Sequence, residues 1–155
     1  MAGQPPSWLP ADFEHSEQVE LDCGDHLRPI RADDVDIDYP AVMGSRERLW
    51  ERYGDPWGWP PSTMTYEQDR DDLARHEREI LAHESFNYAI LNHDESELLG
   101  CVYIDPPEEP GDGDALVSWW VVDARSGSAL ERELTDFVPG WVTAAFPLQH
   151  VRFHP

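Results

Sequence analysis

The stretch that decides the fold is residues 115–146, ALVSWWVVDARSGSALERELTDFVPGWVTAAF. Its first eight residues are rich in Val and Trp and alternate between two largely apolar faces, which is typical of a buried central strand rather than an edge strand. A turn at 123–127 leads into a helix that begins at Ser128, where Ser128 and Glu131 form the S-x-x-E capping pattern. Free N–H groups and the positive end of the helix dipole therefore meet at this turn, which predicts an anion site suited to phosphate.

The rest of this stretch predicts how the sheet closes. Apolar residues recur at helical spacing as far as Ala145, so one stripe of the helix is expected to pack on the sheet. Pro139-Gly140 is expected to kink this helix or split it in two. A short strand at 148–153 follows, and a strand–helix–strand unit of this length favours a parallel, right-handed crossover.

The composition is that of a folded and strongly acidic chain. It has 155 residues, 40% of them hydrophobic, and a formal net charge of −21, with all 11 basic residues being arginine. Such a chain is repelled by nucleic acid and by anionic membranes, so neither is expected as a partner. The acidity is interpreted as a solvated surface, adapted to salt or not, with a functional acidic patch as the alternative.

The sequence also indicates a compartment. The first ten residues have neither a basic nor an apolar region, and no run approaches the length of a membrane span, so no secretory signal is expected. Cys23 and Cys101 are too few for a disulfide framework or a zinc site and are interpreted as free thiols. These features favour the reducing cytoplasm.

The remaining segments predict one domain of class α+β. Residues 1–18 are an irregular lead-in, and residues 19–155 form the domain. Strands are expected at 19–21, 26–30, 86–92 and 98–104, with a bulge at Gly100. Helices are expected at 31–53, interrupted at Pro40, and from Thr63 or Thr65 to Glu84, separated by an irregular aromatic loop at 54–61. An acidic loop follows at 105–114. The sheet is therefore an antiparallel meander with one parallel crossover.

Two motifs in this order of elements carry a family resemblance. HLRPIRADD at 26–34 resembles the opening "LRP-x-x-x-x-D" of the GNAT superfamily of acyl-CoA-dependent N-acetyltransferases, and LLGCVYI at 98–104 resembles its "x-L-x-G-x-x-x-I" strand. The resemblance covers residues 26–153. It implies an open mixed sheet flanked by helices, whose fourth and fifth strands splay to admit the pantetheine arm of acetyl-CoA.

The same resemblance implies a cofactor site. The family's phosphate signature is Arg or Gln, two residues, Gly, one residue, then Gly or Ala. Gly127-Ser128-Ala129 matches its second half, while its first position falls on Ala124. By this resemblance the pyrophosphate would face the amides of Arg125, Ser126, Gly127, Ser128 and Ala129, and pantetheine would pair with the main chain of Val121 and Val122. A plain strand-to-helix turn is the alternative.

The catalytic groups are less well defined. Many members of the family carry a carboxylate on the fourth strand, and 115–122 has none. The family's usual tyrosine acid lies on a helix after the fifth strand, and the sequence ends at Pro155, before that helix and two closing strands could form. Tyr103 is the candidate acid, with a strand tyrosine whose hydroxyl lies at the rim as the alternative. A homodimer could cover the open edge of the sheet.

The acceptor side is predicted from aromatic and acidic residues. Trp57, Trp59 and Tyr66 are candidates for the wall of an amine-binding cleft, with a packed lid as the alternative. The acidic clusters at 33–38 and 67–72 could bind a cationic acceptor or could be solvated faces.

Two other chemistries do not fit the sequence. His76-Glu77 and His83-Glu84 are seven residues apart, about 10 Å along a helix, which is too far for one metal ion, and no metal site is expected. Ser126 and Ser128 lack the G-x-S-x-G elbow of a serine nucleophile. The predicted function is an acetyl-CoA-dependent N-acetyltransferase acting on a small-molecule or protein amine. The alternative is a non-catalytic GNAT-like domain that senses a ligand or binds a protein.

Overall fold

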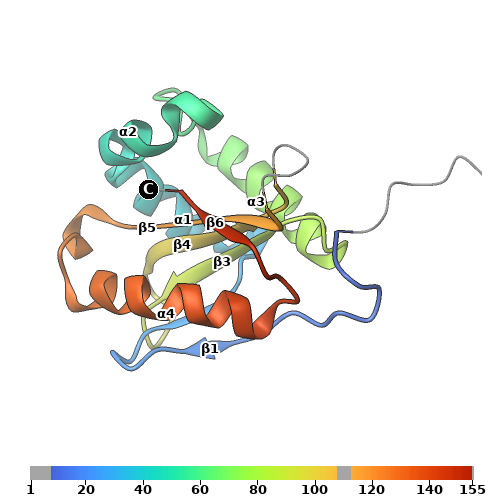
Figure 1. Ribbon diagram of the computed structural model, residues 1–155. Helices are drawn as coiled ribbons and strands as arrows, with labels where there is room; N and C mark the ends of the chain where they lie inside the picture. Colours follow the sequence, from blue (N-terminus) through green and yellow to red (C-terminus); the bar gives the residue numbers. More distant parts are fainter. Residues whose placement is uncertain (1–7, 108–112, 155) are drawn as a thin grey trace, which may run out of the picture.

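The computed structural model describes residues 8–107 and 113–154. Within these residues the strands form one six-stranded sheet in the order β1 to β6 (Figure 1). The strands are β1 (Val19–Glu20), β2 (His26–Pro29), β3 (Phe86–Leu91), β4 (Leu98–Asp105), β5 (Ala115–Val121) and β6 (Val151–Phe153). Neighbouring strands are antiparallel except β5 and β6, which are parallel. The predicted α+β class and the mixed sheet are confirmed.

Helices cover both faces of the sheet. The helix after β5, α4 (Ala129–Ala145), lies on one face, while α1 (Val35–Gly44), α2 (Arg46–Trp57) and α3 (Tyr66–Leu81) lie on the other (Figure 1). Short 3-10 turns, η1 (Ala32–Asp34) and η2 (Asp123–Arg125), precede α1 and α4. None of the helices in the described ranges is long and apolar enough to cross a membrane. The middle of the predicted acidic loop and the start of the lead-in lie outside the described residues.

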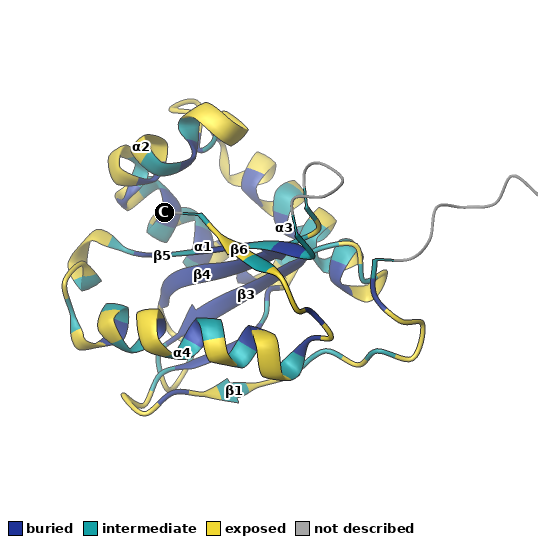
Figure 2. Cartoon of the chain, viewed as in Figure 1, coloured by how far each residue is buried: buried dark blue, intermediate teal, exposed yellow. Residues whose placement is uncertain are grey.

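The two faces of the sheet differ in chemistry. The register places one set of alternate residues under α4, and this set is apolar, including Phe86, Ile90, Val102, Ile104, Val117 and Val121. The buried stripe of α4 packs there, with Trp141 set edge-on to Tyr88. The opposite face carries His26, Arg28, Asn87, Cys101, Tyr103, Ser118 and Trp120. All of these residues are buried, as the dark strands of Figure 2 show. The polar groups of the core therefore lie beneath α1, α2 and α3.

Prolines interrupt the helices less than the sequence suggested. The predicted break at Pro40 is wrong, because α1 runs through it and the helix changes direction at the buried Ser45 instead. The prediction that 54–61 has no regular structure is also wrong for its first half, because α2 continues to Trp57. Pro56 leaves the carbonyl of Arg52 without its helical donor, and the His154 ring Nε2 lies 3.0 Å from that oxygen. Gly58, at φ 61°, ends the helix.

The other helix ends follow the capping patterns in part. α3 begins after Thr65, one of the two predicted starts, with a capping box in which Gln68 N donates to Thr65 Oγ1 and Thr65 N donates to Gln68 Oε1. α3 ends at Leu81, short of the predicted Glu84. The helix α4 is one element from Ala129 to Ala145, so Pro139-Gly140 does not split it.

β5 has two different halves. Its first three residues, 115–117, pair with β6, whereas 118–121 pair with β4 alone. The prediction of a central strand therefore holds for the first half and is wrong for the second. Where β4 pairs with β3, a register shift between Ile90 and Leu91 places the bulge beside Gly100, as predicted. A side chain at Gly100 would meet the Trp120 carbonyl oxygen at 2.0 Å, so this position requires glycine.

The lead-in contacts the domain through aromatic residues. Trp8 Nε1 donates to the Asp114 carbonyl oxygen at 2.8 Å, and Leu9 is buried. The ring of Phe13 contacts Phe86 and Phe146. β6 stays at the outer edge of the described sheet, with an exposed Phe153, and its coverage by a second copy of the chain stays a prediction.

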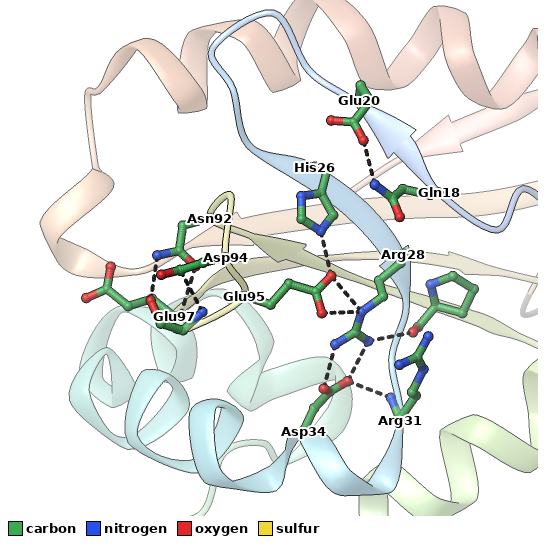
Figure 3. A network of polar contacts seen from close by, with 12 residues as sticks. Gln18, Glu20, His26, Arg28, Arg31, Asp34, Asn92, Asp94, Glu95 and Glu97 are labelled. Atoms are coloured by element: carbon green, nitrogen blue, oxygen red, sulfur yellow. Dashed lines mark hydrogen bonds and ion pairs between the residues drawn. The ribbon is translucent and has the colours of Figure 1, made fainter.

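A buried ion-pair network joins β2 to the start of α1 (Figure 3). Arg28, 5% exposed, donates from Nη1 and Nη2 to both carboxylate oxygens of Asp34, at 2.9 and 2.8 Å. Its Nε donates to Glu95 in the β3–β4 turn, where His26 also contacts the carboxylate. Asp34 in turn accepts from the Arg31 amide and so closes η1. This network fixes where α1 begins.

We expect Arg28→Met to lower the free energy of unfolding by about 3–5 kcal/mol, because the variant leaves the Asp34 carboxylate buried without a partner. Urea denaturation measures this loss. Arg78→Met is the matched control, because Arg78 is exposed on α3 and its loss should cost little. A loss below about 1 kcal/mol in Arg28→Met would show that the network does not hold α1 in place.

Candidate functional site

A slot opens beside the second half of β5. The last contact on this side is the His154 amide, which donates to the Val117 carbonyl oxygen at 2.9 Å, and beyond it β6 no longer follows β5. A hollow of about 250 Å³ lies there, lined by Arg48, Leu49, Glu51, Arg52, Trp120 and Val121. The edge of β5 that the parallel strand leaves unpaired therefore faces an open space.

The two predicted pantetheine partners point in different directions. The Val122 amide donates to the Leu99 carbonyl oxygen of β4, so it faces away from the slot. The Val121 carbonyl oxygen faces the slot and accepts from Arg48 Nη1 at 3.3 Å. Of the two residues, Val121 is therefore placed to pair with a ligand, provided that Arg48 moves.

Four of the five predicted amide donors in the turn before α4 are already used within the protein, contrary to the prediction. The amides of Arg125, Ser126 and Ser128 donate to backbone carbonyl oxygens of the turn itself, those of Val122, Asp123 and Arg125. The Gly127 amide donates to Glu131 Oε1 at 2.8 Å. Ala129 is the remaining predicted donor. The 3-10 turn η2, which the sequence did not indicate, uses these groups internally.

Glu131 occupies the place where an anion was expected. Its amide is 3.4 Å from Ser128 Oγ, which is the first half of the predicted capping box. Its carboxylate does not return to Ser128 and instead holds Gly127, which has the left-handed φ of 72°. A side chain at 127 would meet no atom within 4 Å, so the backbone conformation, rather than space, favours glycine there. The protein thus supplies its own negative charge to the helix N-terminus.

Arginine side chains gather around the same turn. Arg48 Nη1 lies 3.0 Å from Asp123 Oδ1, and Arg132 Nη1 donates to the Gly127 carbonyl oxygen at 2.9 Å. Arg125 lies within the turn, and Arg52 lines the adjacent slot. In a chain of net charge −21, these four arginines outnumber the neighbouring carboxylates of Glu51, Asp123 and Glu131, so the turn and slot can attract an anion.

A second and larger hollow lies beneath α3 on the polar face of the sheet. Its volume is about 790 Å³, and its wall includes Trp57, Trp59 and Tyr103. Its charged lining is mostly acidic, namely Asp38, Asp69, Asp72, Glu79, Glu84 and Asp105, with Arg75 as the cation. Two of the three predicted acceptor residues therefore share one cavity. The third, Tyr66, lies outside this lining and donates its hydroxyl hydrogen to Asp36 at 2.8 Å.

Two carboxyl groups are buried at the inner end of this cavity. Asp38 on α1 and Asp69 on α3 are 3% and 2% exposed and share a side-chain hydrogen bond. Burial, the bond with Asp69 and the nearby Asp34 and Asp72 raise the pKa of Asp38 well above its usual range. Burial also raises the pKa of Asp69. The pair therefore retains a proton at a pH where an exposed aspartate has lost it.

Tyr103 lies between the two hollows. Tyr103 lines the acidic cavity, and Trp120 lines the slot. The hydroxyl oxygen of Tyr103 accepts a hydrogen bond from Trp120 Nε1 at 2.8 Å. Burial raises the pKa of Tyr103 well above its usual range, so the hydroxyl stays protonated. Next to it, Tyr53 donates its hydroxyl hydrogen to Ser118 Oγ at 3.2 Å. Tyr103 is thus buried rather than at the rim, and its hydroxyl can act as a donor.

The histidines of the His76-Glu77 and His83-Glu84 pairs lie in different surroundings. His76 lines the acidic cavity, and burial lowers its pKa to about 4, so its ring is neutral at physiological pH. His83 lies beyond the end of α3, at φ 56°, against Phe13. Among the described residues no group of three or more His, Cys, Asp or Glu side chains is arranged to hold a metal ion.

These elements define a GNAT-type acetyltransferase fold, with a mixed sheet that opens between its parallel strand and the neighbouring strand. No family model matches the sequence, and no curated protein does either. Solved structures do match, at identities that establish the fold alone.

Three of these structures illustrate the likeness. The ribosomal-protein-S5-alanine acetyltransferase of Vibrio fischeri is 18% identical over 90% of this chain and 70% of its own, with a TM-score of 0.64. RimL, a ribosomal L7/L12 α-N-protein acetyltransferase in complex with coenzyme A, is 15% identical over 81% and 68%, with a TM-score of 0.65. Mycobacterium smegmatis RimJ, in complex with CoA-disulfide, is 18% identical over 94% and 69%, with a TM-score of 0.58. The predicted GNAT fold is confirmed.

We expect Asp38→Asn to gain stability relative to the parent protein as the pH rises from about 5 to about 8. The raised pKa of Asp38 means that the folded state binds a proton more tightly than the unfolded state. That contribution is complete below the unfolded-state pKa and is lost as the pH rises through the folded-state pKa, whereas asparagine stays neutral throughout. Urea denaturation at several pH values measures the difference.

The control is Asp33→Asn on η1, the element before α1. The Asp33 side chain is 94% exposed, and the substitution removes the same charge. Its effect on stability should vary little with pH. A pH dependence of the Asp38→Asn difference that matches the control would mean that Asp38 is ionised in the folded protein.

Proposed function

We propose that this chain is an acetyl-CoA-dependent N-acetyltransferase. The observation that carries the proposal is the open edge of β5, where residues 118–121 lack a partner strand on the side of the arginine-lined slot. An extended arm with amide groups can hydrogen-bond to a free strand edge as another strand would. Pantetheine is such an arm, and Val121 is the residue whose carbonyl oxygen faces it.

The phosphates would bind at the turn from Val122 to Ala129. Arg48, Arg125 and Arg132 supply positive charge there, and the N-terminus of α4 adds its dipole. Because the turn already satisfies the amides of 125–128, binding requires Glu131 to release Gly127 or requires the arginines to hold the phosphates without those amides. The fold's likeness to two coenzyme A complexes supports this position for the cofactor.

The acceptor would enter from the acidic cavity. In acetyl transfer a neutral amine attacks the thioester carbonyl, the C–N bond forms and the C–S bond breaks, while the nitrogen gives up one proton and the leaving thiolate takes one. Tyr103 and Trp120 separate the two hollows, so the Tyr103 hydroxyl is the candidate donor for the thiolate. Trp57 and Trp59 form the aromatic wall of the cavity, and the acceptor is an amine of a small molecule or of a protein such as those named for the structural neighbours.

Titration calorimetry with acetyl-CoA, followed by thiol release on an amine panel, tests the proposal. We expect saturable binding and release of coenzyme A with at least one amine. Binding without turnover on any amine would favour the non-catalytic sensing domain. No heat at millimolar acetyl-CoA would refute both the transferase and a domain that senses acetyl-CoA.

We expect Arg48→Ala to weaken acetyl-CoA binding at least about tenfold, since a charge-assisted contact to phosphate is worth about 1.5–3 kcal/mol. Calorimetric titration of the variant measures the change. Arg78→Ala removes the same charge from the exposed side of α3 and should leave the dissociation constant unchanged. An equal effect of both variants would mean that net charge, rather than the slot, governs binding.

We expect Glu131→Ala to tighten acetyl-CoA binding several-fold, because it frees the Gly127 amide and removes a negative charge from the helix N-terminus. Asp136→Ala on the exposed side of the same helix is the control for charge. If Glu131→Ala binds acetyl-CoA more weakly while its melting temperature is unchanged, the turn is not the phosphate site.

A further inference from the structure

The acidic cavity is long, and its charges follow one face of α3. Asp69, Asp72, His76 and Glu79 all line it, at spacings of three, four and three residues, which places them on one side of a helix. From Asp69 to Glu79 the helix rises about 15 Å. Glu84 and Asp105 add carboxylates to the lining from outside the helix. Negative charge is therefore distributed along the cavity rather than gathered at one point.

The inner end of the cavity holds acceptors without donors. Asp69 Oδ2 and Asn87 Oδ1 are buried, their residues are 2% and 3% exposed, and neither atom accepts a hydrogen bond from an N–H or hydroxyl group of the described protein. Both residues line the cavity. A buried acceptor without a donor destabilises the folded protein, so a ligand that donates N–H bonds at this end would remove that cost.

The cavity also has little positive charge. Arg28 compensates Asp34 on the same face of the sheet, but Asp38 and Asp69 have only each other. Arg75 lies near Asp72 and Glu79, at 3.8 and 3.7 Å, from a side chain that is 53% exposed, so it compensates them weakly. His76 is neutral because of its lowered pKa. The described lining thus has an excess of carboxyl groups over cations.

We propose that this cavity binds a linear aliphatic diamine or polyamine, with one ammonium group held by Asp69, Asp38 and Asn87 and a second near Glu79 and Glu84. Carboxylates spread over about 15 Å along α3 match ammonium groups joined by methylene chains better than they match a compact cation. The rings of Trp57 and Trp59 offer apolar contact and cation–π attraction. The same described residues lack the geometry of a metal site, which separates an ammonium ion from a divalent cation.

Binding a cation at the inner end displaces a proton. Besides each other, Asp38 and Asp69 face Asp34 on η1, Asp72 on α3, and Cys101 and Tyr103 on β4. None of these groups supplies positive charge. An arriving ammonium group lowers the pKa of the pair and so releases the proton that it holds. The identity of the ligand as acetyl acceptor rests on the proposed function, whereas its binding does not.

Calorimetry with spermidine, without acetyl-CoA, tests the site. A chain with a net charge of −21 attracts any polycation, so the comparison that decides is between Asp69→Asn and Asp71→Asn, two variants with the same charge on the same helix. Asp69 is buried in the cavity, and Asp71 is exposed. We expect at least a tenfold loss of affinity in Asp69→Asn and less than a twofold loss in Asp71→Asn. Butylamine, with one charge, should bind at least tenfold more weakly than spermidine.

Two further measurements complete the test. Titration in two buffers of different ionisation enthalpy should reveal proton release on binding in the parent protein and a reduced release in Asp69→Asn. Asn87→Ala, which keeps every charge, should also weaken spermidine binding several-fold. Melting curves confirm that the variants are folded.

Equal losses of spermidine affinity in Asp69→Asn and Asp71→Asn would overturn the proposal. So would a finding that magnesium chloride displaces spermidine from the parent protein as readily as it displaces cations bound to the acidic surface. Acetyl-CoA binding is measured separately, so the two ideas fail separately. Spermidine binding without acetyl-CoA binding keeps this site and refutes the transferase. Turnover with other amines and no specific spermidine binding does the reverse.

Discussion

The architecture depends on one buried guanidinium. Arg28 on β2 holds both oxygens of Asp34 and reaches Glu95 in the turn between β3 and β4, so it joins three segments on the polar face of the sheet (Figure 3). A buried pair of this kind seldom adds much net stability, but removal of one partner is costly, so it fixes a single arrangement. Here it sets the start of α1, and thereby presents Asp38, one turn further on, to Asp69 of α3. The acidic cavity follows from that placement.

The second constraint is the short pairing between β5 and β6. Parallel strands that separate after three residues leave backbone groups of the longer strand without a ladder, and such groups need another partner. In this structure the carbonyl oxygen of Val121 uses Arg48. The turn before α4 uses its own carbonyl oxygens and Glu131 in the same way. In both places a charged side chain near the surface satisfies a backbone group. A ligand can displace such a side chain at lower cost than it could displace a paired strand.

Much of the fold could be predicted because local signals agreed with the global pattern. The apolar alternation in 115–121, the Thr65–Gln68 box and the apolar stripe of α4 each specify an element and its buried side. The errors came from tertiary contacts. No local signal reveals that His154 approaches the carbonyl that Pro56 leaves free, nor that the Glu131 carboxylate turns to Gly127 rather than Ser128. The acidic cavity was foreseen only as a cluster of residues, because the burial of Asp38 and Asp69 depends on how α1 crosses α3. A carboxylate at every turn of α3 was the available signal.

The slot and the acidic cavity have opposite charge, and the same pair of residues, Tyr103 and Trp120, separates them. Arginines surround the turn and slot, carboxylates line the cavity, and the Trp120–Tyr103 hydrogen bond joins a residue of each. A group of like charges is costly in a low-dielectric environment, because they repel strongly unless an opposite charge lies among them. An anionic cofactor on one side and a cationic acceptor on the other would satisfy both regions at once. The polar face of this sheet is therefore better understood as a surface for two ligands of opposite charge than as a core that happens to be polar.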